Sequence, residues 1–149
     1  MNCSRRMSVP HLGHGRPSWP YAARLRSKYP DRYREDGFGL WAVVLRETGE
    51  MIGQCGLTMQ HILGEDVVEV GYLFHREFWH RGHAIEAAAA CRDHAFDVLG
   101  VDRVYAQIRD TNIASMNVAI RLGMTVRGRF IKHYRGVEMP HLAFSVDRG

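Results

Sequence analysis

Residues 78–87 have the sequence FWHRGHAIEA and join a strand-like segment to a predicted helix. A diphosphate binds best where several backbone N–H donors converge in a tight turn at the positive end of a helix dipole. Gly82 and Ala84 are small enough to let the main chain approach such a group, and Arg81 can add a charge-assisted contact. The segment is also compatible with an ordinary strand-to-helix connection, so its meaning depends on the elements around it.

Three strand-like segments precede this connection: Leu40–Leu45, Met51–Met59 and Val67–Phe74. The first two flank residues 47–50, whose composition is typical of a hairpin turn, and a loop with Gly64 leads into the third. On the third strand, alternation places four apolar side chains on one face and Glu69, Gly71 and Leu73 on the other. A carboxylate at the centre of an apolar strand is unusual, which makes Glu69 a candidate functional residue.

A helix from about His83 to Leu99 follows the connection, and Gly100 is a plausible terminator. Its apolar positions recur at helical spacing. They predict a buried stripe formed by Ala84, Ala87, Ala88, Cys91, Ala95 and Val98. Arg103–Ile108 is then predicted as a short strand.

A second helix is expected to start at the cap residue Asn112 and to run to Leu122, with Gly123 at its C-terminal end. Helical spacing predicts that three of its side chains face the core, namely Ile113, Met116 and Ile120. Two last strands, Thr125–His133 and Met139–Val146, flank a turn at Arg135 and Gly136.

Residues 1–18 show no periodicity and are predicted to be irregular, and a short helix is predicted at about residues 19–33. The predicted order is helix, three strands, long helix, strand, helix and two strands. This order indicates one α+β domain with a mixed sheet, spanning residues 19–149, after the irregular basic segment of residues 1–18.

The composition excludes several classes of protein. The net charge of +4 arises from +5 in residues 1–36 and −1 in the remainder, so the folded body has no basic stripe and nucleic acid is not an expected partner. Apolar stretches such as Leu40–Leu45 are too short to cross a bilayer.

The three cysteines are widely spaced in the sequence and form no disulfide framework or zinc-binding pattern. Buried thiols at Cys55 and Cys91 and a cytoplasmic location are expected. The Arg-rich first 30 residues also fit an organelle transit peptide, although a loose N-terminus is preferred.

A metal site is also not expected. His75, His80 and His83 lie around the connecting loop, but no aspartate or cysteine completes a recognised ligand pattern. Basic histidines beside a phosphate-binding loop have a simpler explanation.

Four segments resemble, in the same order, the successive signatures of the GNAT-type N-acetyltransferases. They are Glu69–Tyr72, Trp79–Ala87, Asn112–Ser115 and Leu122–Met124. The resemblance is strongest to the branch that acetylates ribosomal-protein N-termini (the RimJ/RimL type), and it runs from about residue 38 to residue 146. Two departures stand out. The family usually carries Gly at the position of His80, and the first strand and helix of the family are predicted to be absent or replaced.

The resemblance implies a single GNAT-like domain whose two central strands splay apart, with reduced N-terminal elements and with acetyl-CoA as co-substrate. Main-chain groups of the third strand would hold the pantetheine arm, and the loop would hold the pyrophosphate. The residues implied as cofactor-binding are Tyr72, Leu73, Phe74, Arg81, Gly82, His83, Ala84, Ile85, Asn112 and Asn117.

The resemblance also implies direct acetyl transfer within a ternary complex. A protonated amine must lose a proton before it attacks, and Glu69 is the candidate base, acting through water. Its alternative role is that of an ion-pair partner for a nearby arginine, and Glu138 is a weaker second base. Ser115 is the implied proton donor or hydrogen-bond partner of the leaving thiolate, and Tyr105 and Tyr134 are alternative acids.

The expected function is therefore an N-acetyltransferase acting on a primary amine, either a protein N-terminus or a small molecule. The alternative is a non-catalytic acyl-CoA-binding module, which the reduced N-terminal elements favour. No membrane is expected among the partners, and family relatives often form homodimers.

Overall fold

The computed structural model describes residues 7–8 and 39–149, which form one seven-stranded mixed sheet with the order β1-β2-β3-β4-β5-β7-β6. The strands are β1 (Met7–Ser8), β2 (Leu40–Leu45), β3 (Met51–Ile62), β4 (Glu65–Phe74), β5 (Arg103–Arg109), β6 (Thr125–Tyr134) and β7 (Val137–Asp147). The helices are the short 3-10 turn η2 (Arg76–Phe78), α3 (His83–Asp97) and α4 (Ile113–Arg121). The α+β fold is thereby confirmed.

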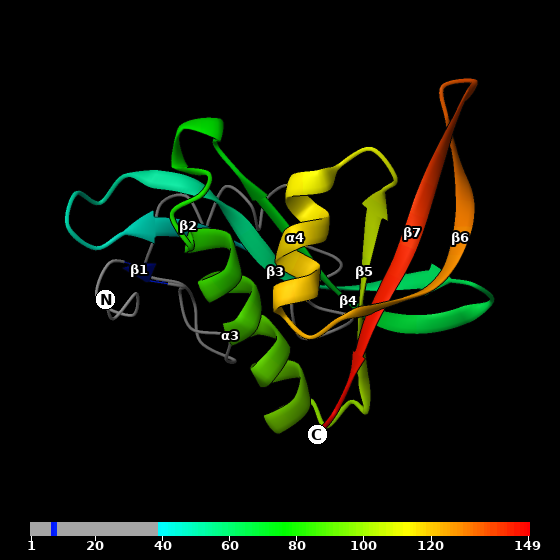
Figure 1. The fold of residues 1–149 in the computed structure, drawn as a ribbon. Helices are drawn as coiled ribbons and strands as arrows, with labels where there is room; N and C mark the ends of the chain where they lie inside the picture. Colours follow the sequence, from blue (N-terminus) through cyan, green and yellow to red (C-terminus); the bar gives the residue numbers. More distant parts are fainter. Residues whose placement is uncertain (1–6, 9–38) are drawn as a thin grey trace.

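Both α-helices lie on the same face of the sheet (Figure 1). The main core forms between them and that face, and alternate residues of β3, β4 and β5 point into it. Cys55 of β3 and Cys91 of α3 are fully buried there, with their sulfur atoms 3.6 Å apart. The prediction that these cysteines act as small buried side chains is confirmed.

The centre of the sheet is its one parallel junction. All other neighbouring strands pair antiparallel, but β4 and β5 run parallel and share a single pairing, between Glu69 and Tyr105. By contrast, all of β5 from Arg103 to Arg109 pairs with β7. The two central strands therefore separate beyond Glu69, as the splayed pair of the expected fold requires.

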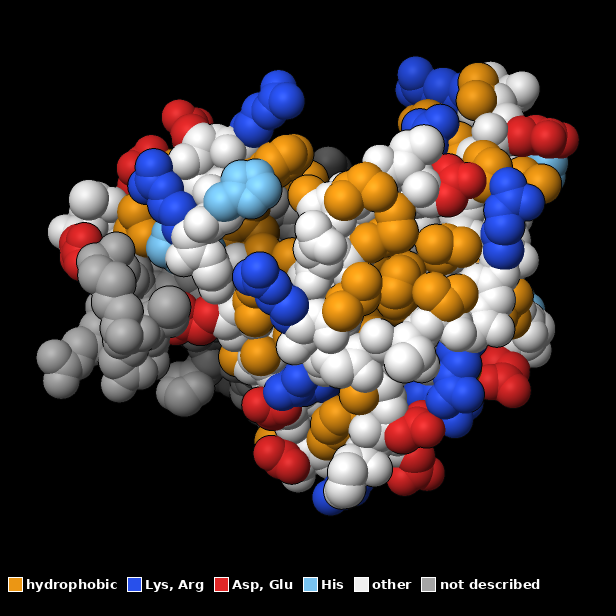
Figure 2. Space-filling view, in the orientation of Figure 1, with side chains coloured by type: hydrophobic (Ala, Val, Ile, Leu, Met, Phe, Trp, Pro, Cys, Tyr) orange, Lys and Arg blue, Asp and Glu red, His pale blue; other side chains and the backbone are white. Residues whose placement is uncertain are grey.

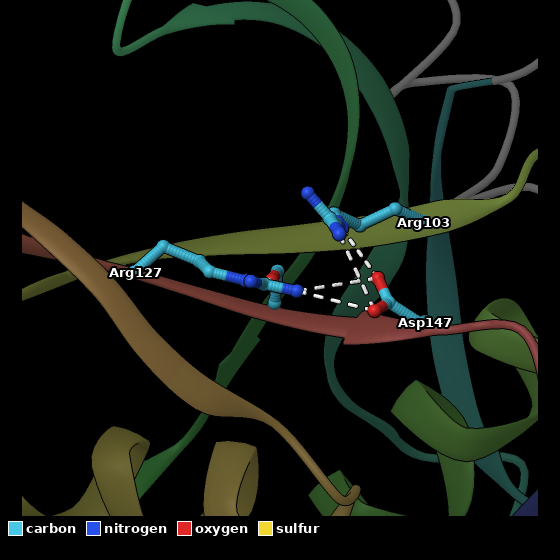
Figure 3. Close-up of polar contacts among 4 residues, drawn as sticks. Arg103, Arg127 and Asp147 are labelled. Carbon is cyan, nitrogen blue, oxygen red and sulfur yellow. Dashed lines mark hydrogen bonds and ion pairs between the residues drawn. The ribbon is translucent and has the colours of Figure 1, made fainter.

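Three adjacent strands are tied together at Asp147, near the end of β7 (Figure 3). Its carboxylate accepts hydrogen bonds from Arg103 of β5 and from Arg127 of β6, the latter at 3.2 Å. Arg103 and then Arg127 lower the pKa of Asp147 below its usual value, because both favour the charged carboxylate. Arg127 also donates to the Ser145 hydroxyl at 2.7 Å.

The hairpins follow the predicted turns. Arg135 and Gly136 both have positive φ, at 49° and 76°, as expected for a tight two-residue connection between β6 and β7. β3 extends three residues past the predicted Met59, because Leu63 and Gly64 make a similarly tight turn with positive φ. The predicted loop at Gly64 is thus a close hairpin.

Two predicted core positions of α4 are wrong. Ile113 and Ile120 are 63% and 59% exposed, and Ala119 is the buried residue of this helix. Successive residues of an α-helix are rotated by about 100°, so the face centred on Ala119 is turned by about 100° from the predicted face at Ile120. Met116, close to this face, packs against the core as predicted. Apolar side chains consequently gather on the surface around α4 and the β6–β7 hairpin (Figure 2).

One position of the predicted stripe on α3 is also wrong. Val98 is 65% exposed, whereas Phe96 is buried. The helix ends at Asp97, two residues before the predicted Leu99, and Gly100 follows with a φ of 70°. Because Val98 is the C-cap, its side chain no longer continues the buried stripe.

At the N-terminal end the two described residues, Met7 and Ser8, pair antiparallel with Leu45 and Val44 of β2. The predictions of an irregular segment and of a missing first strand are wrong for these two residues, which form a strand at the edge of the described sheet. The predicted helix at residues 19–33 and the boundary at residue 18 lie outside the described residues.

Candidate active site

A cavity of about 250 Å³ opens where β4 ends and α3 and α4 begin. Its walls come from the last residues of β4, the loop before α3, the first turn of α3 and one face of α4. The lining residues are Tyr72, Leu73, Phe74, Phe78, Trp79, His80, Gly82, His83, Ala84, Ile85, Asn112, Ala114, Ser115, Asn117, Val118 and Arg121. The structure thus brings together all the predicted cofactor-binding residues except Arg81, together with Ser115.

The loop before α3 adopts the tight turn that its sequence predicts. His80 and Gly82 have left-handed φ angles of 60° and 82°, and Gly82 is the N-cap of α3. The first turn of a helix carries N–H groups that have no acceptor within the helix. Residues 82–85, which begin this helix, lie along the cavity, so its wall combines small residues with a helix N-terminus. That combination suits an anionic group.

His80 occupies a position that a glycine would fill with less strain. A φ of 60° is uncommon for a residue with a Cβ, although histidine adopts it more readily than most. The family's usual glycine is thus explained by the backbone, and the substitution leaves the turn intact. His80 is among the residues that line the cavity.

Tyr72 connects β4 to α4 across the cavity. Its hydroxyl donates to the main-chain oxygen of Ser115 at 2.7 Å, and the Ser115 N–H donates to the Asn112 side chain at 3.1 Å. Asn112 is therefore the helix cap that the sequence predicted. Burial raises the pKa of Tyr72 well above its usual value, with further contributions from Cys55 and Glu69. The hydroxyl consequently keeps its proton and remains a donor.

Replacing Tyr72 with phenylalanine is expected to lower the free energy of unfolding by about 1 kcal/mol, because it removes one part-buried hydrogen bond. It should also weaken acetyl-CoA binding, since α4 loses a tie to β4 at the cavity. Urea unfolding and calorimetric titration measure the two effects. Tyr134→Phe, at an exposed hairpin position, is the matched control. Unchanged stability of Tyr72→Phe would show that this bond does not hold α4 in place.

Trp79 covers the end of β4. Its indole N–H donates to the main-chain oxygen of Phe74 at 2.9 Å, and the Arg76 guanidinium lies over its ring. The Phe74 carbonyl oxygen therefore already accepts a hydrogen bond within the protein.

Arg81 was predicted as a cofactor contact but does not line the cavity. Its guanidinium lies 5.6 Å from the centre of the Phe78 ring.

Glu69 lies on the opposite face of the sheet, at the point where β4 and β5 separate. Gln107 of β5 donates a hydrogen bond to its carboxylate. A Cβ added at Gly71 would lie 4.0 Å from the Glu69 Oε1 atom, so the carboxylate lies beside the backbone of Gly71. It is half-buried beside the single pairing of β4 with β5, and it is not among the residues that line the cavity.

The alternative acids and bases lie elsewhere. Glu138 and Tyr134 are exposed near the tip of the β6–β7 hairpin. Tyr105 is buried in a small second cluster formed by Ile62, Val67, Tyr105 and Ala143. Neither tyrosine lines the cavity.

Sequence reasoning missed six lining residues. Phe78, Trp79 and His80 belong to the loop itself, whereas Ala114, Val118 and Arg121 form one face of α4. The last three recur at helical spacing with Asn117, so a helical projection anchored on Asn117 would have found them. Arg121 adds a cationic side chain to the cavity wall.

No group of three or more potential metal ligands occurs among the described residues. Similarly, none of the helices that the structure describes is long and apolar enough to cross a membrane.

The family model for the acetyltransferase (GNAT) domain matches residues 4–125. The chain belongs to the GNAT acetyltransferase family. It is 42% identical over 92 residues to the uncharacterized protein YkkB from Bacillus subtilis, covering 60% of this chain and 54% of that protein. The chain spans about half the length of the curated relatives it matches.

Solved structures of acetyltransferases share this fold. An acetyltransferase from Agrobacterium tumefaciens is 28% identical with a TM-score of 0.66, covering 91% of this chain and 77% of that one. A ribosomal-protein alanine acetyltransferase from Vibrio fischeri is 20% identical with a TM-score of 0.69, covering 81% and 67%. These structures support the single-domain architecture.

Proposed function

We propose that this GNAT domain transfers the acetyl group of acetyl-CoA directly to a primary amine. The observation that carries the proposal is the pairing of β4 with β5 at Glu69 alone. Beyond that pairing the strands separate, with the cavity on the helix side and the Glu69 carboxylate on the other side. A thioester held in the gap is then open to an amine arriving from the Glu69 side.

The cofactor is proposed to lie in the cavity of about 250 Å³. The N-terminus of α3, with Gly82–Ile85, suits the diphosphate, and Arg121 and His80 add polar contacts. Residues 72–74 of β4 would bind the pantetheine arm through main-chain groups. Because the Phe74 oxygen already accepts from Trp79, Tyr72 and Leu73 supply most of these contacts.

Glu69 is proposed to act as the general base. An amine with an ordinary pKa arrives mostly protonated, so its proton must leave before the lone pair can attack. The Gln107 amide donates to this carboxylate and holds it where the two strands separate, and from there it is proposed to take the proton through water. The main-chain N–H near Leu73 would stabilise the negative charge that develops on the thioester oxygen.

Ser115 is proposed to donate a hydrogen bond to the departing thiolate of coenzyme A, which then takes its proton from solvent. It lines the cavity, and its main chain is held from both sides by Tyr72 and Asn112. A fixed main chain restricts where the hydroxyl can lie. A covalent route through cysteine is not favoured, because Cys55 and Cys91 are buried against each other in the core.

We further propose a protein N-terminus as the acceptor. The sequence segments that resemble the ribosomal-protein acetyltransferase branch support this proposal. So does the likeness in fold to the ribosomal-protein alanine acetyltransferase. The acceptor class is a separate question from acetyl transfer, and the two can be tested separately.

Calorimetric titration with acetyl-CoA, desulfo-CoA and adenosine diphosphate tests the cofactor site. Saturable binding that requires the pantetheine arm is the expected result. Release of free coenzyme A is then measured with N-terminal peptides beginning with alanine or serine, and with spermidine. Cofactor binding without turnover on any amine would favour the non-catalytic acyl-CoA-binding module instead.

A further inference from the structure

The face of the sheet that carries Glu69 holds a second polar group that the proposed mechanism does not use. Gln107, which bonds Glu69, pairs with Ala143 of β7, and the next pairing on this face joins Arg109 to His141. Directly paired residues of antiparallel strands share a face. His141 is therefore on the same face as Glu69, as a diagonal neighbour of Gln107 at roughly 7–8 Å between Cα atoms.

The imidazole of His141 is held on two sides. Its Nδ1 lies 2.8 Å from the main-chain oxygen of Met139, and its ring stacks on Phe130 of β6 with centroids 5.8 Å apart and planes 28° apart. Phe130 in turn packs against the buried cluster that contains Tyr105. The ring is half-buried, and its position is set by contacts with β6 and with its own strand β7.

The contact with Met139 decides the tautomer. A carbonyl oxygen only accepts hydrogen bonds, so Nδ1 must carry the hydrogen. In the neutral ring Nε2 is then a hydrogen-bond acceptor. The fixed ring thus presents a hydrogen-bond acceptor on the face from which an amine would approach Glu69.

We propose that His141 is an acceptor-binding residue whose Nε2 accepts a hydrogen bond from an N–H of the amine substrate. The inference rests on the proposed function and names a residue of that same acceptor site. Glu69 takes the proton that the amine loses, whereas His141 orients a remaining N–H, or the first peptide N–H of an N-terminal substrate.

The alternative interpretation is that His141 has only a structural role, in which it packs on Phe130 and donates a hydrogen bond to the main-chain oxygen of Met139. The two readings differ in what happens to Nε2. A packing role needs the ring and Nδ1 alone, whereas the proposed role needs the acceptor at Nε2. An asparagine side chain can keep the donor near Met139 while removing the acceptor at the Nε2 position.

The test is His141→Asn in the full chain. The KM for the amine should rise about tenfold or more, as expected for one hydrogen bond to a charged group. The KM for acetyl-CoA and the melting temperature should stay the same. His133→Asn, an exposed histidine on β6, is the matched control and should change neither constant. An unchanged KM for the amine in His141→Asn, or an equal rise for both substrates, would overturn the proposal.

Imidazole nitrogen resonances separate this proposal from the proposed activity. The ¹⁵N signal of His141 Nε2 is followed while alaninamide is added to the protein saturated with desulfo-CoA, which cannot be turned over. A saturable shift of Nε2, absent in His141→Asn, supports the acceptor site even if no turnover is found. Absence of a shift, with turnover intact, overturns the role of His141 and leaves the acetyltransferase proposal standing. Absence of both a shift and turnover overturns both proposals.

Discussion

Replacing Glu69 with glutamine is expected to lower kcat for amine acetylation about a hundredfold or more, which is the usual contribution of a general base. Glutamine keeps the size of the side chain and can still pair with Gln107, but it cannot take a proton from the amine. The cofactor cavity lies on the other face of the sheet and does not include Glu69. The affinity for acetyl-CoA should therefore stay close to that of the wild-type protein.

Steady-state kinetics and calorimetry measure the two halves of this expectation. Glu65→Gln is the matched control, because Glu65 lies on the same strand but is exposed at the hairpin end. It should leave kcat unchanged. A Glu69→Gln variant that retains most of its kcat would assign the carboxylate a structural role, and Glu138→Gln would then be the next variant to measure.

Local features were the most predictable part of the molecule. The Asn112 cap, the turn at Arg135 and Gly136 and the helix-ending glycine at position 123 all lie where residue type alone placed them. Each depends on the conformational preferences of one or two residues. Such preferences act over a few residues, so a single sequence is sufficient to reveal them.

The rotation of a short helix was not predictable in the same way. The spacing of Ile113, Met116 and Ile120 is helical, but α4 has only nine residues and buries Ala119 instead. A small residue lets the helix approach the sheet closely, while its neighbouring face forms the cavity wall. Tertiary contacts determine which face of the helix is buried. A periodic pattern over only nine residues does not distinguish one face from the next.

The parts of the site formed by residues close together in the sequence were predictable. Contacts between residues far apart in the sequence were not. The loop from Gly82 to Ile85 was found from its sequence, whereas the bond from Tyr72 to Ser115 joins residues 43 positions apart. The splay of β4 from β5 came from the resemblance to the family, since no local pattern encodes a missing strand pairing. The positions of Arg81 and Trp79 likewise depend on packing around η2.

Replacing Gly53 with alanine is expected to be the most damaging single substitution of a glycine beside the site. A Cβ there would lie 2.4 Å from the main-chain oxygen of Leu73 and 2.8 Å from the Phe74 Cα atom. Both atoms belong to the backbone of β4, so this strand itself has to shift. We expect the free energy of unfolding to fall by about 3 kcal/mol, the upper range for an overpacked site. The melting temperature should then fall by roughly 6–12 °C.

The same substitution should also weaken acetyl-CoA binding, because Leu73 and Phe74 form one wall of the cavity. Gly71→Ala is the matched control on the neighbouring strand, where the added Cβ would meet only the end of the Leu40 side chain at 3.6 Å and Glu69 Oε1 at 4.0 Å. It should unfold at about the wild-type temperature, since both are ordinary contacts. Thermal unfolding of the two variants, followed by titration of each with acetyl-CoA, measures the difference. If Gly53→Ala loses stability but binds acetyl-CoA normally, the end of β4 does not position the cofactor, and the wall formed by α3 and α4 has to supply the affinity instead.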